Sequence, residues 1–134
     1  MKRTALLHAE LSQVIASLGH GDMLVLGDAG LPIPDGPRRI DLAVSRGVPR
    51  LADVLQAVLS EMQVEGVVVA GEALVDAPGE VKQLPAWYPQ SLGIAPQTVS
   101  HEEFKRRTAQ ARAMVRTGEC TPYANIILIA GVSF

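Results

Sequence analysis

Two histidines lie where general acid-base chemistry could use them. His20, in "LGHGD", follows apolar residues at helical spacing, and Gly19 is placed to end that helix, so we expect the helix to end at His20. His101, in "SHEE", would be the first residue of a second helix, because Ser100 and Glu103 match a capping box. A helix C-terminus favours imidazolium and a helix N-terminus favours neutral imidazole, each by about 0.3 to 1 kcal/mol. The pattern predicts His20 as the acid and His101 as a base or neutral partner; a structural or surface role is the alternative for each.

Three further polar residues flank predicted strands. Asp28 directly follows the apolar run 23–27, and open α/β sheets place ligand groups at the carboxyl ends of strands, although "DAG" is also a common turn. Asn125 lies at the start of the apolar run 124–132, where its amide needs a ligand hydroxyl or a backbone group as partner. Tyr123 combines an apolar ring with a hydroxyl, which suits a sugar or a residue at the rim of the core. These groups can meet only if the last strand runs antiparallel to the first, or if another subunit supplies it.

The elements that must position these residues alternate between strands and helices. After the strand at 23–27 comes a Pro- and Gly-rich loop over 28–50 with room for one short extended piece at "RIDLAV". An apolar stripe from Leu51 to Met62 predicts a helix, and "GVVVAG" at 66–71 predicts a buried strand. We therefore expect an α/β fold: one three-layer domain over residues 1–134, with a mixed, mostly parallel sheet flanked by helices.

The region after this strand is harder to assign. Residues 76–96 contain four prolines and form an irregular stretch, after which the capped helix is predicted to run from His101 to about Thr117, where Gly118 stops it. In the predicted capping box the Glu103 carboxylate reaches back to Ser100. Such a helix would carry Lys105, Arg112 and Arg116 on one face, which we interpret as a solvated surface.

Composition excludes several classes of function. A formal charge of -2, with both signs spread along 134 residues, gives no reason to expect nucleic acid or an anionic membrane as partner. One cysteine, Cys120, excludes an intramolecular disulfide and favours a reducing compartment. Because we find neither a signal-peptide pattern nor a long apolar run, we expect a cytoplasmic protein.

Cofactor motifs are also missing from the sequence. The glycines at 19–30 lack the Lys-Ser/Thr ending of a phosphate loop and follow a predicted helix rather than a strand, so they do not form a dinucleotide fingerprint. A metal site built from His20, Asp22, Asp28 and His101 is conceivable by ligand type but has no metalloenzyme spacing. We interpret Cys120 as an incidental thiol.

Several longer motifs together resemble the D-ribose pyranase family, the ribose-operon branch of a group that also contains L-fucose mutarotase. They are "LGHGD", "DAGLPIP", "RIDLA", "GVP", "EMQVE", "HEEFK" and "GECTPYANIILIAGVSF". The resemblance runs nearly from end to end and is weak only across 72–97.

The resemblance implies an isomerase without cofactor or metal, which interconverts the β-pyranose and β-furanose forms of D-ribose and so supplies ribokinase. It implies His20 as proton donor and Asp28, His101, Tyr123, Ala124 and Asn125 as substrate contacts. It also implies a homo-oligomer, typically a ring of ten subunits, with sites near subunit contacts. A mutarotase for another sugar such as L-fucose, a non-catalytic sugar-binding protein and a metal-dependent isomerase are the competing hypotheses.

Overall fold

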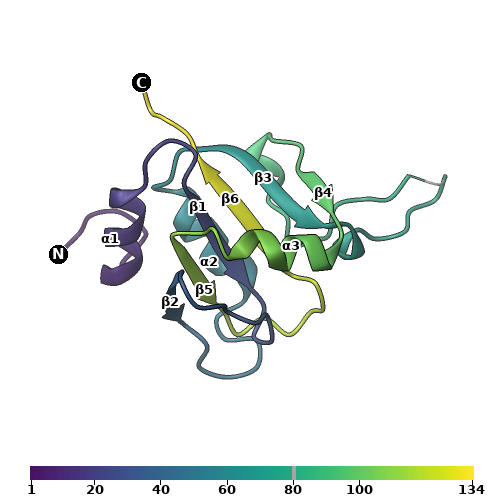
Figure 1. Ribbon diagram of the computed structural model, residues 1–134, viewed down its shortest axis with the longest axis horizontal. Helices are drawn as coiled ribbons and strands as arrows, with labels where there is room; N and C mark the ends of the chain where they lie inside the picture. Colours follow the sequence, from purple (N-terminus) through teal and green to yellow (C-terminus); the bar gives the residue numbers. More distant parts are fainter. Residues whose placement is uncertain (80) are drawn as a thin grey trace.

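The computed structural model describes residues 1–79 and 81–134, which form one sheet with helices on both sides (Figure 1). Along the chain the elements are α1 (Ala9–Ser17), β1 (Met23–Gly27), β2 (Arg38–Asp41), α2 (Leu51–Leu59), β3 (Val64–Ala70), η1 (Gly71–Ala73), η2 (Gln90–Leu92), β4 (Gln97–Val99), α3 (His101–Thr108), β5 (Ala113–Arg116) and β6 (Ile126–Ala130). Within the described residues, no helix is long and apolar enough to cross a membrane.

The sheet is mixed and mostly parallel, as expected from the sequence. Its order is β2-β5-β1-β6-β3-β4. Adjacent strands pair in parallel except around β6, which runs antiparallel to both β1 and β3. In Figure 1 the arrowheads of β3 and β6 accordingly point in opposite directions. This reversal brings the start of β6 to the carboxyl ends of β1 and β3.

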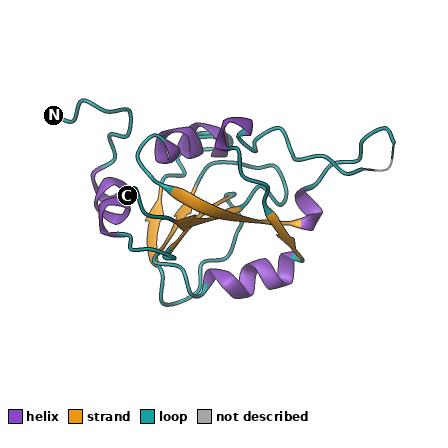
Figure 2. Ribbon diagram, turned by 90° about the horizontal axis from the view of Figure 1, so that it is seen from above, coloured by secondary structure: helices purple, strands orange, loops and turns teal. Residues whose placement is uncertain are grey.

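Helices lie on both faces of the sheet (Figure 2), and an apolar layer packs against each face. Alternate residues of one strand serve opposite layers: Leu24 and Leu26 of β1 pack with α1 and α2, whereas Val25 packs with Phe104 of α3. All three of these strand side chains are fully buried. The three-layer α/β architecture predicted from the sequence is confirmed.

The first helix ends earlier than predicted. Helix α1 stops at Ser17, and its C-cap residue Leu18 has extended backbone. The residue with left-handed backbone is Gly21, at φ 82°, not Gly19. His20 therefore lies beyond the helix end, and the helix-dipole argument for its protonation does not hold, because that effect is confined to the last turn.

The prediction of a long helix from His101 to Thr117 is wrong. Helix α3 begins at His101 as expected but ends at Thr108, and the chain then enters β5 between β1 and β2. Ala113, Met114 and Val115 are buried there, so tertiary packing overrides the helix propensity of an Ala- and Arg-rich segment. Arg112 and Arg116 consequently share no helix face with Lys105.

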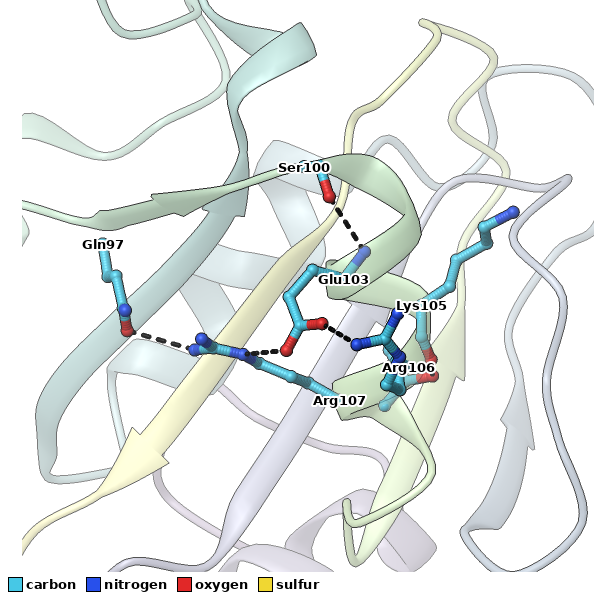
Figure 3. Close-up of polar contacts among 7 residues, drawn as sticks. Gln97, Ser100, Glu103, Lys105, Arg106 and Arg107 are labelled. Carbon is cyan, nitrogen blue, oxygen red and sulfur yellow. Dashed lines mark hydrogen bonds and ion pairs between the residues drawn. The ribbon is translucent and has the colours of Figure 1, made fainter.

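The structure confirms one of the two hydrogen bonds predicted for the capping box at the start of α3 (Figure 3). The Ser100 hydroxyl accepts a hydrogen bond from the Glu103 backbone N–H at 3.1 Å, as predicted. The Glu103 carboxylate does not reach back to Ser100; it accepts from Arg106 at 2.6 Å and from Arg107 at 3.2 Å. Two cations one turn further along the helix outcompete a neutral backbone donor.

Candidate active site

Asp28 and Asn125 meet because β6 runs antiparallel to β1. Asp28 follows the last residue of β1, Asn125 precedes the first residue of β6, and the Asp28 backbone N–H donates to Asn125 Oδ1 at 2.8 Å. The Asn125 side chain is completely buried. Its Nδ2 group has no hydrogen-bond partner among the described residues. A buried amide donor without a partner is costly, so this group is a candidate to donate to a ligand oxygen.

The Asp28 side chain also forms a local turn. Its Oδ1 accepts from the Gly30 backbone N–H at 2.8 Å, which is the turn that the "DAG" sequence allows. The turn and a ligand contact are compatible, because an ionised carboxylate has two oxygens and several lone pairs.

His101 lies at the same end of the sheet as Asn125. It follows β4, which pairs in parallel with β3, and its backbone N–H donates to the Glu72 carboxylate at 2.9 and 3.1 Å. Its Nδ1 atom is buried and has no partner among the described residues. The imidazole ring contacts Tyr123 edge-on, with ring centroids 5.0 Å apart. His101 and Asn125 thus each bring an unsatisfied polar atom to this end of the sheet.

Tyr123 has an unusual backbone conformation. Its φ of 61° makes it the one non-glycine residue with positive φ in the described chain. Its carbonyl oxygen accepts from the Asn125 N–H at 2.8 Å, so a tight turn sets the directions of both side chains, with the buried Ala124 between them. A left-handed conformation costs a bulky residue roughly 1 to 2 kcal/mol, and such strain is often found at ligand sites.

Glu119 stabilises the chain just before this turn through hydrogen bonds with Thr121. Its carboxylate accepts from the Thr121 hydroxyl at 2.9 Å, from the Thr121 N–H at 3.3 Å and from the Leu51 N–H at the start of α2 at 3.2 Å. Burial raises the pKa of Glu119, but the hydrogen bonds from Thr121, Leu51 and Cys120 outweigh it and lower the pKa below its usual value. The ionised form is therefore the one that holds the turn.

A cavity of about 520 Å³ opens beside Tyr123, in the size range of small-molecule sites. Its polar side chains include Glu72, Glu119 and Tyr123; its apolar wall includes Leu74 and Trp87. Asp28, His101 and Asn125 do not line it directly, but His101 contacts both Glu72 and Tyr123. Glu72 and Tyr123 therefore connect the cavity to His101.

His20 lies at the opposite end of the sheet. Its neighbour Gly21 donates its N–H to the carbonyl oxygen of Ala130, at the far end of β6, at 2.8 Å. Ala130 lies five residue steps after Asn125, which corresponds to about 16 Å along a strand. Within one chain, the predicted proton donor is thus about a strand length from the other predicted site residues. The four acidic and histidine residues considered as metal ligands are likewise split, and no group of three or more His, Cys, Asp or Glu side chains in residues 1–79 and 81–134 could hold a metal ion.

Three glutamates next to the predicted residues were not identified from the sequence. Glu72 and Glu119 line the cavity, and Glu65 contacts His20 Nε2 through both carboxylate oxygens, at 2.8 and 2.9 Å. Glu65 could have been noticed in the sequence, because it is the one charged residue in the strand "VEGVVVA". Glu72 and Glu119 follow a strand or a glycine in positions that composition does not distinguish from ordinary loops.

Comparison with known proteins identifies relatives along the whole chain. A model of the RbsD / FucU transport protein family matches residues 1–133. A D-ribose pyranase of Variovorax paradoxus (strain S110) is 71% identical, with all of both chains covered. The structure of Bacillus subtilis RbsD complexed with D-ribose superimposes with a TM-score of 0.87 at 42% identity, again with both chains fully covered. A fucose mutarotase in complex with L-fucose from Streptococcus pneumoniae gives 0.78 at 26% identity over 100% of both chains.

Proposed function

The chain belongs to the RbsD / FucU transport protein family, and we propose that it interconverts the β-pyranose and β-furanose forms of D-ribose without a cofactor. The relative named D-ribose pyranase, at 71% identity over the full length, supports the activity, and the ribose-bound RbsD structure supports the sugar. Within the molecule, the observation that carries the proposal is the pair of buried, unsatisfied atoms, Asn125 Nδ2 and His101 Nδ1, at one end of the sheet. A sugar offers the hydroxyl groups that both atoms require.

In this proposal the substrate contacts come from one end of the sheet. Asn125 and His101 bond sugar hydroxyls through their unsatisfied nitrogens, and Asp28 accepts from a hydroxyl through its carboxylate. Tyr123 offers its ring and hydroxyl, and Ala124 holds the turn between Tyr123 and Asn125. The Tyr123 side chain is 39% exposed, which leaves it accessible to a ligand.

His20 is the proton donor in this proposal, and it must come from a second copy of the chain. The distance of about 16 Å along β6 is longer than a pentose, so one chain cannot place His20 and Asn125 on the same sugar. A neighbouring subunit in a closed ring could bring its His20 to this end of the sheet. We therefore infer a homo-oligomer, and the family resemblance gives ten subunits as the expectation. We further propose that the protein is located in the cytoplasm, as expected from the sequence.

The reaction requires a proton at the ring oxygen. His20 gives a proton to this oxygen as its bond to C1 breaks, and the anomeric hydroxyl loses a proton to a base, which leaves an open-chain aldehyde. His101 is the candidate base, since its Nδ1 atom has no partner among the described residues. A different hydroxyl then attacks C1 and gives its proton to His20. The aldehyde oxygen takes back the proton that the base had accepted. Acid-base assistance of this kind contributes about 10² to 10⁴ in rate.

The test is saturation transfer by NMR between the pyranose and furanose signals of ribose, with and without the protein. Accelerated exchange of ribose that persists with a chelator present is the expected result. Faster exchange of L-fucose anomers than of ribose forms would instead favour the fucose branch. Ribose binding without acceleration would identify a sugar-binding protein, and loss of activity with the chelator would identify a metal-dependent isomerase.

A further inference from the structure

Strand β3 is irregular at Glu65. Val64 pairs with Ala130 and Gly66 pairs with Ile129, so two steps along β3 match one step along β6 and Glu65 is the extra residue. A bulge of this kind redirects the side chain of the extra residue and is common next to functional sites. The bulge lies at the end of the sheet that carries His20.

Gly131 makes room for the redirected carboxylate. A Cβ atom at position 131 would lie 3.0 Å from Glu65 Cβ and 3.4 Å from Glu65 Oε2. The first distance is tighter than most Cβ contacts, so a side chain at position 131 would require Glu65 to shift by a few tenths of an ångström. Gly131, which directly follows β6, therefore leaves the space that Glu65 occupies.

Asp22 stabilises the loop that carries His20 through two hydrogen bonds. Asp22 accepts from the Gly19 N–H at 2.8 Å and from Arg112 Nε at 3.1 Å. The hydrogen bond with the Gly19 N–H, and then that with Arg112, lowers the pKa of Asp22. Asp22 and Arg112 thus satisfy each other's charge next to the loop.

Both oxygens of Glu65 lie within hydrogen-bond distance of His20 Nε2, at 2.8 and 2.9 Å. An ionised carboxylate can only accept, so Nε2 carries the hydrogen in this contact. The other ring nitrogen, Nδ1, is then the one that can exchange a proton with a substrate. A carboxylate on one nitrogen of a catalytic histidine fixes the ring and its tautomer in the same way in other enzymes.

We propose that Glu65 is a positioning residue that holds His20 through Nε2 and leaves Nδ1 to act on the sugar. The inference rests on the proposed function, in which His20 is the acid. In ring opening, Nδ1–H gives its proton to the ring oxygen as that oxygen takes the electron pair of the C1–O bond. In ring closure, the attacking hydroxyl returns a proton to Nδ1. Glu65 only accepts the hydrogen bond from Nε2–H and exchanges no proton with the sugar.

The experiment measures ribose exchange by saturation transfer over a range of ribose concentrations in wild type, Glu65→Ala and Glu65→Gln. We expect Glu65→Ala to lower kcat by about 10- to 100-fold, part of what a positioned acid supplies. KM should change by less than about twofold, because Glu65 itself bonds no group of the sugar in this proposal. Glu65→Gln should recover part of the loss, since its amide oxygen can still accept from Nε2–H.

Two further variants separate positioning from structural damage. Gly131→Ala should lower kcat in the same direction by displacing Glu65, without changing any group that exchanges a proton. Glu61→Gln removes a nearby carboxylate that pairs with Lys2 instead of His20, and it should leave kcat unchanged.

The outcomes distinguish the two proposals. An active wild type with full activity in Glu65→Ala would overturn the role of Glu65 and leave the function standing. A rise in KM together with a fall in kcat, with no recovery in Glu65→Gln, would identify a merely structural residue and also overturn it. A wild type that does not accelerate exchange would overturn the function, and this inference with it.

Discussion

Tyr123 combines a left-handed backbone with a partly exposed aromatic residue beside a cavity, as expected of a side chain held in place for a ligand. Its ring is supported edge-on by His101 at 5.0 Å, so the ring position does not depend on the hydroxyl. The hydroxyl can therefore be removed without disturbing the turn.

Tyr123→Phe should raise KM for ribose by about 2- to 10-fold, the value of one hydrogen bond of about 0.5 to 1.5 kcal/mol. Its melting temperature should stay close to that of the wild type. Tyr88→Phe is the matched control, because the Tyr88 hydroxyl donates to the Ile94 carbonyl oxygen at 2.6 Å within the core. That variant should melt earlier with KM unchanged; the reverse pattern in the two variants would contradict our assignment of Tyr123.

At the scale of elements, Glu119 connects the start of α2 to the turn before β6. The ionised carboxylate accepts hydrogen bonds from Leu51 and Thr121 more strongly than the protonated carboxyl group would. Its pKa is accordingly lowered in the folded protein. A lowered pKa contributes stability at pH values above the unfolded pKa, near 4.5, and this contribution is lost as the pH falls through the folded value.

Glu119→Gln should therefore unfold more easily than wild type at pH 7, by about 1 to 2 kcal/mol. The difference should shrink as the pH is lowered below 4.5, where the wild-type carboxyl becomes protonated. Urea unfolding at several pH values measures it. Glu10→Gln is the control, since Glu10 is an exposed glutamate in the first turn of α1. A difference that is constant with pH would exclude the ionised carboxylate as the cause.

The elements show where sequence patterns succeed and fail. The apolar run 23–27 predicts β1 correctly because both faces of that strand are buried, which demands a continuous apolar sequence. The segment after Thr108 misleads because its alanines and arginines suit a helix equally well, and only the gap between β1 and β2 selects a strand. Strand β4 has three residues, two of them exposed, and carries no pattern at all.

The candidate site was predictable to a similar extent. Asp28, His101, Tyr123 and Asn125 could be named as candidates from motifs, and the antiparallel pairing of β6 with β1 brings them to one end of the sheet. Glu65 could not, because its contact with His20 joins residues 45 positions apart through a bulge. Register irregularities of this kind depend on the assembled sheet.

At the scale of the whole molecule, the proposed function requires one site to be divided between two subunits. His20 and Asn125 lie at opposite ends of β6, so each site in a ring would use the His20 of one copy and the sugar contacts of another. Two inactive variants with defects at opposite ends should then complement each other.

Mixed assemblies of His20→Ala and His101→Ala subunits should recover activity. If subunits mix at random in equal amounts, about a quarter of the sites would be intact. The measurement is saturation-transfer exchange after the two variants are unfolded and refolded together, with each variant refolded alone as the control. Mixed assemblies that remain as inactive as each variant alone would show that the two residues do not share a site.

Comparison of wild type with His20→Ala shows whether this chain opens the ring of D-ribose with His20 as the acid. His8→Asn serves as the control, because His8 is the other histidine outside the sugar contacts and asparagine can keep its cap on α1. We predict that wild type and His8→Asn accelerate pyranose–furanose exchange, and that His20→Ala is slower by about 10² or more. Full activity in His20→Ala would contradict the account.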